Sequence, residues 1–361
     1  MERLEFLDSF RGVLCISVLL SHYDIGSETL SGFFLGVIGF FILSSFLLTH
    51  RLIKQYENAK NIHQIINITI NYFIMRFFRI YVPYMIFCIL NVELIKEKDV
   101  IKDYTIYHFI SLKDFVQMIH IWTMPVEIKF YFIIPPLAYI FSNIYKKKLI
   151  VWIIYLMNFI YMIIVKRFNL FSVGDFYDVA EFEPYIPIFL MGSILAVLYI
   201  HLEHSKGLEL LNQYRINNYI ISLICIIIFV CLCRFQGWFN SDRNNGFICA
   251  SFMSLLLLFM LIVPANYLNQ FLSQIKTFYI FGKYSYGVYL FHINCRNESR
   301  KFQSIMISDQ FILYIILSLV VGIIFFHIIE NNSMKLAKLC MNQVNKYFSS
   351  YKEPIEITIN K

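Results

Sequence analysis

The sequence is poor in charge and has no tract typical of a separate soluble domain. Only 15% of its 361 residues are charged and 58% are hydrophobic, whereas soluble proteins carry about a quarter charged residues. The net charge of +7 is spread along the loops and forms no basic block, which argues against nucleic-acid binding. These features predict an integral membrane protein.

The usual marks of a disulfide framework, a metal site and a cleaved leader are also missing. Six of the eight cysteines lie in apolar runs, where cysteine behaves as a small hydrophobic residue. Cys231 and Cys233 are two apart on an expected helix, so they point about 200° away from each other and cannot share a metal ion. The N-terminal apolar run has no small-residue cleavage site, so we expect a retained span. We predict no metal cofactor.

Ten apolar segments are long enough to cross a hydrocarbon core, which takes about 17 to 25 helical residues. They are residues 4–23, 33–53, 71–95, 120–141, 149–165, 184–201, 218–234, 247–265, 278–294 and 311–330. The expected fold is all-α, a polytopic membrane protein with about ten transmembrane helices around a central cavity. We assign residues 1–334 to one membrane domain and residues 335–361 to a short cytoplasmic tail. After Glu330 we expect a short charged helix, such as MKLAKLCMNQVNKYF.

Loop charge predicts how the chain lies in the membrane. The segment DIGSETLSG after the first span has no basic residue, whereas YKKKL at 145–149 has three lysines. Basic loops favour the cytoplasmic side. We therefore expect both termini in the cytoplasm and the chain embedded in the lipid bilayer of the inner (plasma) membrane.

The first span, LDSFRGVLCISVLLSHY, carries Asp8, Arg11 and His22 in an otherwise apolar stretch. Charged groups inside a membrane are costly, so they usually have partners and a function. Helical spacing places the three on one stripe, and Arg11 and His22 are separated by roughly 16 Å of helical rise. They are therefore expected at the inner and outer depths of one cavity. The alternative is a buried Asp8–Arg11 pair, with His22 reaching the outer headgroups.

The third span contains NYFIMRFFRIYVPY, which places Arg76 and Arg79 three residues apart on one helix face in its inner half. Guanidinium groups present forked donors and keep their charge when partly buried. The pair therefore suits a phosphate-bearing ligand that enters from the cytoplasm. The alternative is that both arginines anchor the helix to anionic headgroups.

The fourth span contains HIWTMPVEIKFYFIIPP, where Glu127 lies a turn or two below an outer interface marked by Trp122. This depth is near that of His22. A carboxylate beside an imidazole fixes its tautomer, which would make His22 a general base toward a hydroxyl group. The alternatives are that Glu127 pairs with Lys129 or Tyr131, or that it stays protonated.

Weaker polar candidates lie in FFILSSF of the second span and in KYSYGVYLFH of the ninth. Hydroxyl groups in such spans commonly bond a carbonyl of their own helix or a neighbouring helix. Tyrosines in a chain with 18% aromatic residues more often pack than bind. The candidate substrate contacts are Asp8, Ser44, Tyr131, Ser285 and His292.

Taken together, these stretches resemble the acyltransferase family 3 of integral membrane acyltransferases, which acylate bacterial polysaccharides, lipopolysaccharide O-antigens, peptidoglycan and some small molecules. The resemblance runs from Leu7 to about Glu330. It rests on the order and spacing of LDSFRGVLCISVLLSHY with its Arg-x10-His arrangement, GVIGFFILSSFLLT, RFFRIYVPY, HIWTMPVEIKFY, FLMGSILAVL, SYGVYLFH and FHIIENNSMK.

The resemblance implies an enzyme that moves an acyl group, usually acetyl, from cytoplasmic acetyl-coenzyme A to a hydroxyl of a cell-surface polysaccharide or glycan precursor. It implies that His22 is the essential histidine and Arg11 its motif partner. Arg76 and Arg79 then handle the coenzyme A thioester. Glu127 matches the glutamate of the family's Trp-x-x-x-Val-Glu signature.

This chain departs from the family pattern at three positions that bear on the acceptor and the donor. Ser45 replaces the usual glycine, Pro125 a serine, and Ile128 a second acidic residue. Many members also carry a periplasmic hydrolase-like domain. The 361 residues contain no such domain, so we expect the membrane part to act alone or with a separate partner.

A transporter or flippase is the rival hypothesis, because intramembrane charges also line substrate and proton pathways. The sequence has no paired repeats or matching Gly/Pro-broken helices of the kind many transporters show. A third alternative is a degenerate member retained as an envelope-assembly partner. Whether the chain forms a homodimer stays open.

Overall fold

The computed structural model describes residues 5–23, 33–91, 121, 123–168, 185–204, 207–213, 215–239, 246–302 and 306–350. Within these residues every regular element is helical and none is a strand, which confirms the all-α prediction. The helices are α1 (Glu5–Ser21), α2 (Phe33–Glu57), α3 (Ile62–Arg76), α4 (Val82–Leu90), α7 (Thr123–Ile144), α8 (Lys148–Phe168), α9 (Ile186–His204), α10 (Gly207–Gln213), α11 (Arg215–Phe239), α12 (Gly246–Ile262), α13 (Tyr267–Gln274), α14 (Lys276–Lys283), α15 (Ser285–Arg300), α16 (Ile307–Phe325) and α17 (Asn331–Ser350), with the π-helical turns η1 (Phe77–Tyr81) and η8 (Phe326–Glu330).

A helix occupies the described part of each of the ten predicted spans. Among the described residues, four helices are long and apolar enough to cross a membrane, and five are if the bent pair of α12 and α13 counts as one span. The chain is therefore membrane-spanning, while the count of ten stays a prediction. One predicted span is broken, because Tyr284 separates α14 from α15. Helices α12 and α13 meet at 91° at the end of the span predicted for residues 247–265.

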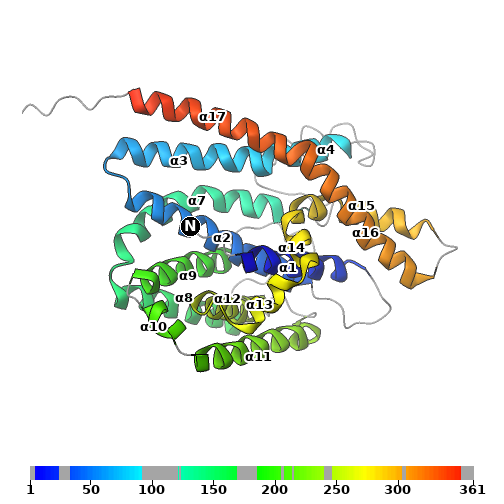
Figure 1. Cartoon of the computed structure of the whole chain (residues 1–361), viewed down its shortest axis with the longest axis horizontal. Helices are drawn as coiled ribbons and strands as arrows, with labels where there is room; N and C mark the ends of the chain where they lie inside the picture. The colour runs from blue at the N-terminus through cyan, green and yellow to red at the C-terminus, as the bar shows by residue number, and fades with distance from the viewer. Residues whose placement is uncertain are drawn as a thin grey trace, which may run out of the picture.

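The helices lie mostly side by side, with α1 near the middle of the bundle (Figure 1). Helix α1 packs against α2 and α14, and α2 packs in turn against α7 and α9. On one side of the bundle, α17 lies along α3. Helix α16 continues through η8 into α17 without a break. The helix predicted after Glu330 is therefore present, and it runs across the predicted domain boundary at residue 334.

Two glycines let α1 approach α14 at backbone distance. A Cβ atom added at Gly12 would overlap the carbonyl of Phe278, and one added at Gly282 would overlap the carbonyl of Asp8. Small residues allow close helix contacts in membrane proteins, where the hydrophobic effect supplies little force between helices. The crossing fixes the segment of α1 that carries Arg11.

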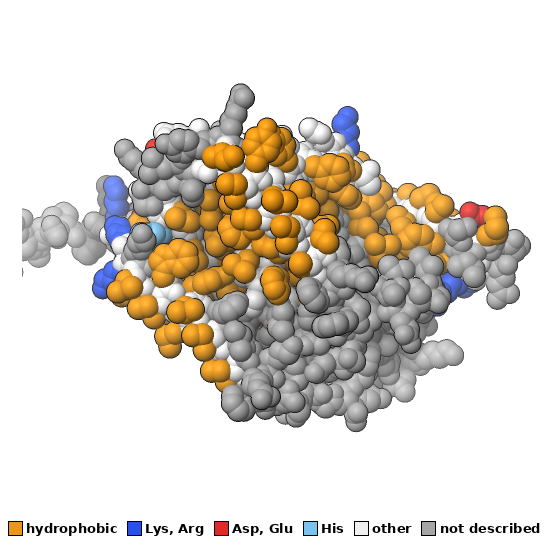
Figure 2. All heavy atoms as spheres, turned by 90° about the horizontal axis from the view of Figure 1, so that it is seen from below, with side chains coloured by type: hydrophobic (Ala, Val, Ile, Leu, Met, Phe, Trp, Pro, Cys, Tyr) orange, Lys and Arg blue, Asp and Glu red, His pale blue; other side chains and the backbone are white. Residues whose placement is uncertain are grey.

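The outer surface is apolar, as expected for a chain in contact with lipid. Figure 2 shows hydrophobic side chains over much of the described part of one face, with Lys and Arg side chains toward its ends. Large apolar side chains are exposed along α8 and α11, where they include Leu149, Leu156, Met157, Ile216 and Leu223. In a soluble protein such a surface would be a liability, whereas a bilayer covers it.

Gly12→Ala is expected to destabilise the protein more than Gly39→Ala does. At Gly12 the new methyl group meets a backbone carbonyl, whereas at Gly39 it meets the flexible end of the Leu14 side chain. We expect a loss of about 2 kcal/mol for Gly12→Ala, in the range of overpacked cores. Thermal unfolding in detergent compares the two variants, and equal midpoints would contradict the close crossing.

Candidate functional site

One cavity of about 120 Å³ lies between α1, α2, the α3–η1 junction, α7 and α15. Seven of the ten predicted site residues line it: Arg11, Ser44, Arg76, Arg79, Glu127, Tyr131 and Ser285. The remaining three, Asp8, His22 and His292, are not among its described lining residues. The structure therefore brings most of the predicted set together from five segments that are distant in sequence.

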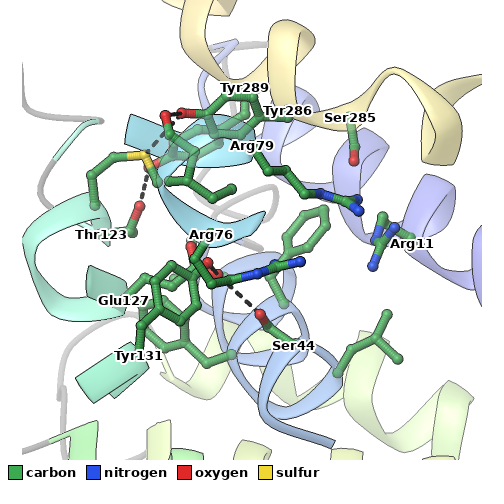
Figure 3. Close-up of a pocket in the computed structure, with 16 residues that line it drawn as sticks. Arg11, Ser44, Arg76, Arg79, Thr123, Glu127, Tyr131, Ser285, Tyr286 and Tyr289 are labelled. Atoms are coloured by element: carbon green, nitrogen blue, oxygen red, sulfur yellow. Dashed lines mark hydrogen bonds between the residues drawn. The ribbon is translucent and has the colours of Figure 1, made fainter. Parts of the chain in front are cut away.

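Three guanidinium groups face one another across this cavity. In Figure 3 the side chains of Arg76 and Arg79 extend in the same direction, toward Arg11 on the opposite helix. Arg79 feels the repulsion of both other arginines as well as the attraction of Glu330. Like charges repel one another, more strongly where they are partly buried, as Arg11 and Arg76 are. A bound anion would relieve that repulsion and use the free faces of the guanidinium forks.

A π-turn begins directly after Arg76 and contains Arg79. Arg76 ends α3, and η1 follows at Phe77. Pro83, near the start of α4, has no N–H group and so removes a backbone donor from the preceding turn. A π-turn adds one residue to the helical turn, and the second π-turn, η8, forms without a proline after it. Both side chains of the Arg-x-x-Arg pair line the cavity. They do so from the end of α3 and from the π-turn, whereas the sequence predicted one face of a regular α-helix.

The carboxylate of Glu127 is held by two hydroxyl groups. Ser44 Oγ donates to Glu127 Oε1 at 3.0 Å, and Tyr131 Oη donates to the same oxygen at 2.5 Å. The Tyr131 ring also lies 5.8 Å from Arg76 Cζ, within cation–π range. Glu127 therefore organises the arginine end of the site.

The expected pairing of Glu127 with His22 is wrong. Both residues are described, and the hydrogen bonds of the carboxylate go to hydroxyl groups. The alternative that Glu127 pairs with Tyr131 is confirmed. Sequence position gave a similar depth for the two residues, but the i, i+4 neighbour on α7 reaches the carboxylate first. Trp122, the interface marker used for that depth, lies outside the described residues.

His22 follows the end of α1 and contacts a second imidazole. Its ring centroid is 4.8 Å from that of His292, with the planes tilted by 48°. His292 Nδ1 lies 2.6 Å from the carbonyl of Tyr289, so this nitrogen carries the proton, because a carbonyl only accepts. Arg296 Nη1 donates to the carbonyl of His22 at 2.9 Å. The histidine pair is thus anchored to α15.

Helix α15 links the two ends of the site. Tyr289 lines the cavity, and its hydroxyl is 2.6 Å from Thr123 Oγ1. His292 lies one helical turn further along, with its ring centroid 5.7 Å from that of Tyr289. The pair His22–His292 therefore adjoins the cavity at Tyr289, while Arg11, about 16 Å of rise from His22, lies among the other guanidinium groups.

Asp8 forms an ion pair with Arg11, which is the alternative given for this pair in the sequence analysis. Its Oδ1 lies 3.9 Å from Arg11 Nη1, and both side chains are about one-fifth exposed. The contact is at the limit of a salt bridge, so it balances charge without closing the guanidinium fork. Substrate binding by Asp8 stays a prediction.

Glu330, Thr123 and Tyr289 are site residues that the sequence did not assign. Glu330 is buried, and it attracts Arg79. A Cβ atom added at Gly287 would lie 3.2 Å from Glu330 Oε1, which places the carboxylate against α15. The marker FHIIENNSMK contained Glu330, and its charge inside an apolar run was a signal that could have been followed.

Metal chemistry has no support from the described part of the chain, where no three His, Cys, Asp or Glu side chains are grouped to hold an ion.

Ser45, which stands where the family usually has glycine, packs at the α2–α9 contact. Its hydroxyl donates to the carbonyl of Ile42 at 3.0 Å and occupies the space that a Cβ atom at Gly192 would need. Gly192 therefore accommodates this departure.

A family model described as an acyltransferase domain matches residues 4–330. The O-acetyltransferase OatA of Staphylococcus aureus strain NCTC 8325 is 25% identical over 313 residues, which cover 79% of this chain and 49% of that protein, and the OatA of strain COL matches equally. The chain spans about half the length of these curated relatives. No solved structure matches.

Inorganic pyrophosphate is expected to raise the thermal unfolding midpoint of the detergent-purified protein, because an anion relieves the repulsion among the three guanidinium groups. Arg76→Gln should abolish this shift. Arg51→Gln should keep it, because Arg51 is exposed on α2 and outside the cavity lining. Differential scanning fluorimetry measures all three proteins, and an undiminished shift in Arg76→Gln would contradict anion binding at the cavity.

Proposed function

Because this chain belongs to the acyltransferase family whose domain model spans residues 4–330, we propose that it is a membrane O-acetyltransferase that uses acetyl-coenzyme A as donor and a cell-surface polysaccharide or glycan precursor as acceptor. The observation that supports this most is the convergence of three arginines on one cavity beside a histidine pair. The names of the staphylococcal relatives support transfer to oxygen.

Arg11, Arg76 and Arg79 hold the donor in this proposal. Guanidinium groups recognise phosphate oxygens through paired hydrogen bonds, and coenzyme A carries several phosphate oxygens at one end and its thioester at the other. Thr123, Ser44 and Ser285 add hydroxyl groups to the lining. The hydrogen-bond donors of the lining are therefore of the right chemical kind for the phosphates.

His22 acts as the general base at the outer end. Its imidazole takes the proton of the acceptor hydroxyl as the oxygen attacks the acyl carbon and the carbon–sulfur bond breaks. The same proton then returns to the thiolate, so the products are an ester and coenzyme A. His292 and Arg296 hold His22 in place, the first through its ring and the second through the backbone carbonyl.

The proposed setting is the inner membrane with both termini in the cytoplasm. The arginine end then faces the cytoplasm, where the donor is made, and His22 faces the exterior, where the glycan lies. The lysines at 145–149 and the basic-free segment after α1 support this orientation. Assembly as a homodimer, or with an envelope partner, is compatible with the exposed apolar surface.

The transporter hypothesis loses its main support through family membership. The intramembrane charges also form a cluster and not a continuous pathway. Asp8 pairs with Arg11, Glu127 attracts Arg11, and Glu330 attracts Arg79. Such a cluster binds an anionic group at one place. It therefore fits a donor-binding site better than a chain of relay groups.

His22→Gln is expected to abolish acetylation of the surface glycan while leaving donor binding unchanged. Loss of a general base lowers the rate about 10² to 10⁴-fold, and His22 lies outside the arginine cavity. Mass spectrometry of envelope polysaccharide measures acetylation in a deletion strain that carries either the parent gene or the variant. Thermal stabilisation by acetyl-coenzyme A measures donor binding.

The double variant Arg76→Gln/Arg79→Gln is expected to lose both glycan acetylation and thermal stabilisation by acetyl-coenzyme A. Immunoblots verify that the strains contain equal levels of the protein. An unchanged glycan in cells that express His22→Gln at the parent level would overturn the role of His22. A glycan that is identical with and without the parent gene would overturn the proposed acceptor.

A further inference from the structure

The arginine pair depends on a turn whose backbone has lost a donor. In a π-turn, the carbonyl of one residue accepts from the N–H five residues later, as the Val82 N–H does to the carbonyl of Phe77. The next such pair would be Pro83 to Phe78. Pro83 has no N–H, so the carbonyl of Phe78, which lies between Arg76 and Arg79, lacks its partner within the helix.

Two hydroxyl groups from other helices reach the carbonyls of this turn. Ser333 Oγ of α17 donates to the carbonyl of Phe78, and Tyr286 Oη of α15 donates to the carbonyl of Ile80 at 2.7 Å. Ser333 is only 4% exposed, and α17 packs directly on η1. The Ser333 hydroxyl thus takes the place of the backbone donor that Pro83 removes.

We propose that Ser333 is a positioning residue for the donor site, which acts by holding the π-turn that sets Arg76 and Arg79 on the cavity. This proposal rests on the proposed function of that arginine pair. Ser333 is not among the described residues that line the cavity, so its effect reaches the donor through the backbone of Phe78. Tyr286 secures the same turn from the cavity side.

A buried carbonyl without a partner is costly, so the turn changes when the hydroxyl is removed. The residue most affected is Arg79, which lies directly after Phe78. Arg76 belongs to α3, whose backbone hydrogen bonds do not depend on Ser333. Loss of the hydroxyl therefore turns one guanidinium group away from the cavity and leaves the other in place.

Ser333→Ala is expected to weaken acetyl-coenzyme A binding about tenfold, which corresponds to about 1.4 kcal/mol. Ser333→Thr keeps a hydroxyl and should restore most of the affinity. Ser349→Ala is the matched control, because Ser349 lies on the same helix and its hydroxyl donates within its own turn, to the carbonyl of Lys346. Titration of the purified full-length chain with acetyl-coenzyme A, followed by thermal shift, measures each dissociation constant.

A double-mutant cycle separates positioning from simple helix packing. Pro83→Ala returns an N–H group to the turn, so Ser333→Ala should cost less than about twofold in affinity in that background. A packing role predicts the same loss in both backgrounds and would overturn the proposal. Ser333→Cys, with a weaker donor, gives an intermediate affinity and substitutes for the alanine variant if the latter is not recovered folded.

The outcomes also distinguish this proposal from the proposed function. A parent protein that acetyl-coenzyme A stabilises through Arg76 and Arg79, together with a Ser333→Ala variant of equal affinity, overturns the positioning role alone. A parent protein that acetyl-coenzyme A does not stabilise overturns the donor assignment and the positioning role together.

Discussion

The repulsion among three guanidinium groups in one cavity is the constraint on which the rest of the structure depends. Arg11, Arg76 and Arg79 carry like charges in a bundle whose exterior is apolar. Arg11 and Arg76 are half-buried and Arg79 is exposed, and like charges that converge on one cavity repel one another unless opposite charges offset them. The fold offsets them with carboxylates at the periphery, Asp8 beside Arg11 and Glu330 near Arg79, which leave the cavity side of the guanidinium groups open.

Backbone features, more than side-chain contacts, bring these charges together. Gly12 and Gly282 let α1 cross α14 closely enough to aim Arg11 at the cavity. Pro83 removes a backbone donor from the helix after α3, directly beyond the π-turn that carries Arg79. Both features are local in sequence, yet each acts only because another helix supplies the matching glycine or hydroxyl group.

The sequence predicted the membrane class and the main site residues for a physical reason. Charges in apolar runs are costly, so Arg11, Arg76, Arg79 and Glu127 stood out without any structure, and all four line the cavity. What failed was the pairing of Glu127 with His22. Helical depth along one span does not decide which neighbour a side chain meets, because the rotation and packing of helices are tertiary properties.

The partner of His22 shows the same limit. His292 was visible in the ninth span, but its contact with His22 depends on how α15 lies against α1. The sequence also could not decide the number of spans, because an apolar segment does not show whether its helix is continuous. Tyr284 divides one predicted span into α14 and α15, and this division lets α14 meet α1 while α15 forms the wall of the cavity.

The account places the anionic end of the donor among the arginines and the reacting end near His22, on opposite sides of Tyr289. The most direct test is a cryo-electron microscopy map of the full chain in lipid nanodiscs with a non-reactive thioether analogue of acetyl-coenzyme A. Phosphate density against Arg76 and Arg79, with the acyl end directed toward His22, is the predicted result. Phosphate density elsewhere on the protein, with the arginine cavity empty at saturating analogue, would contradict the account.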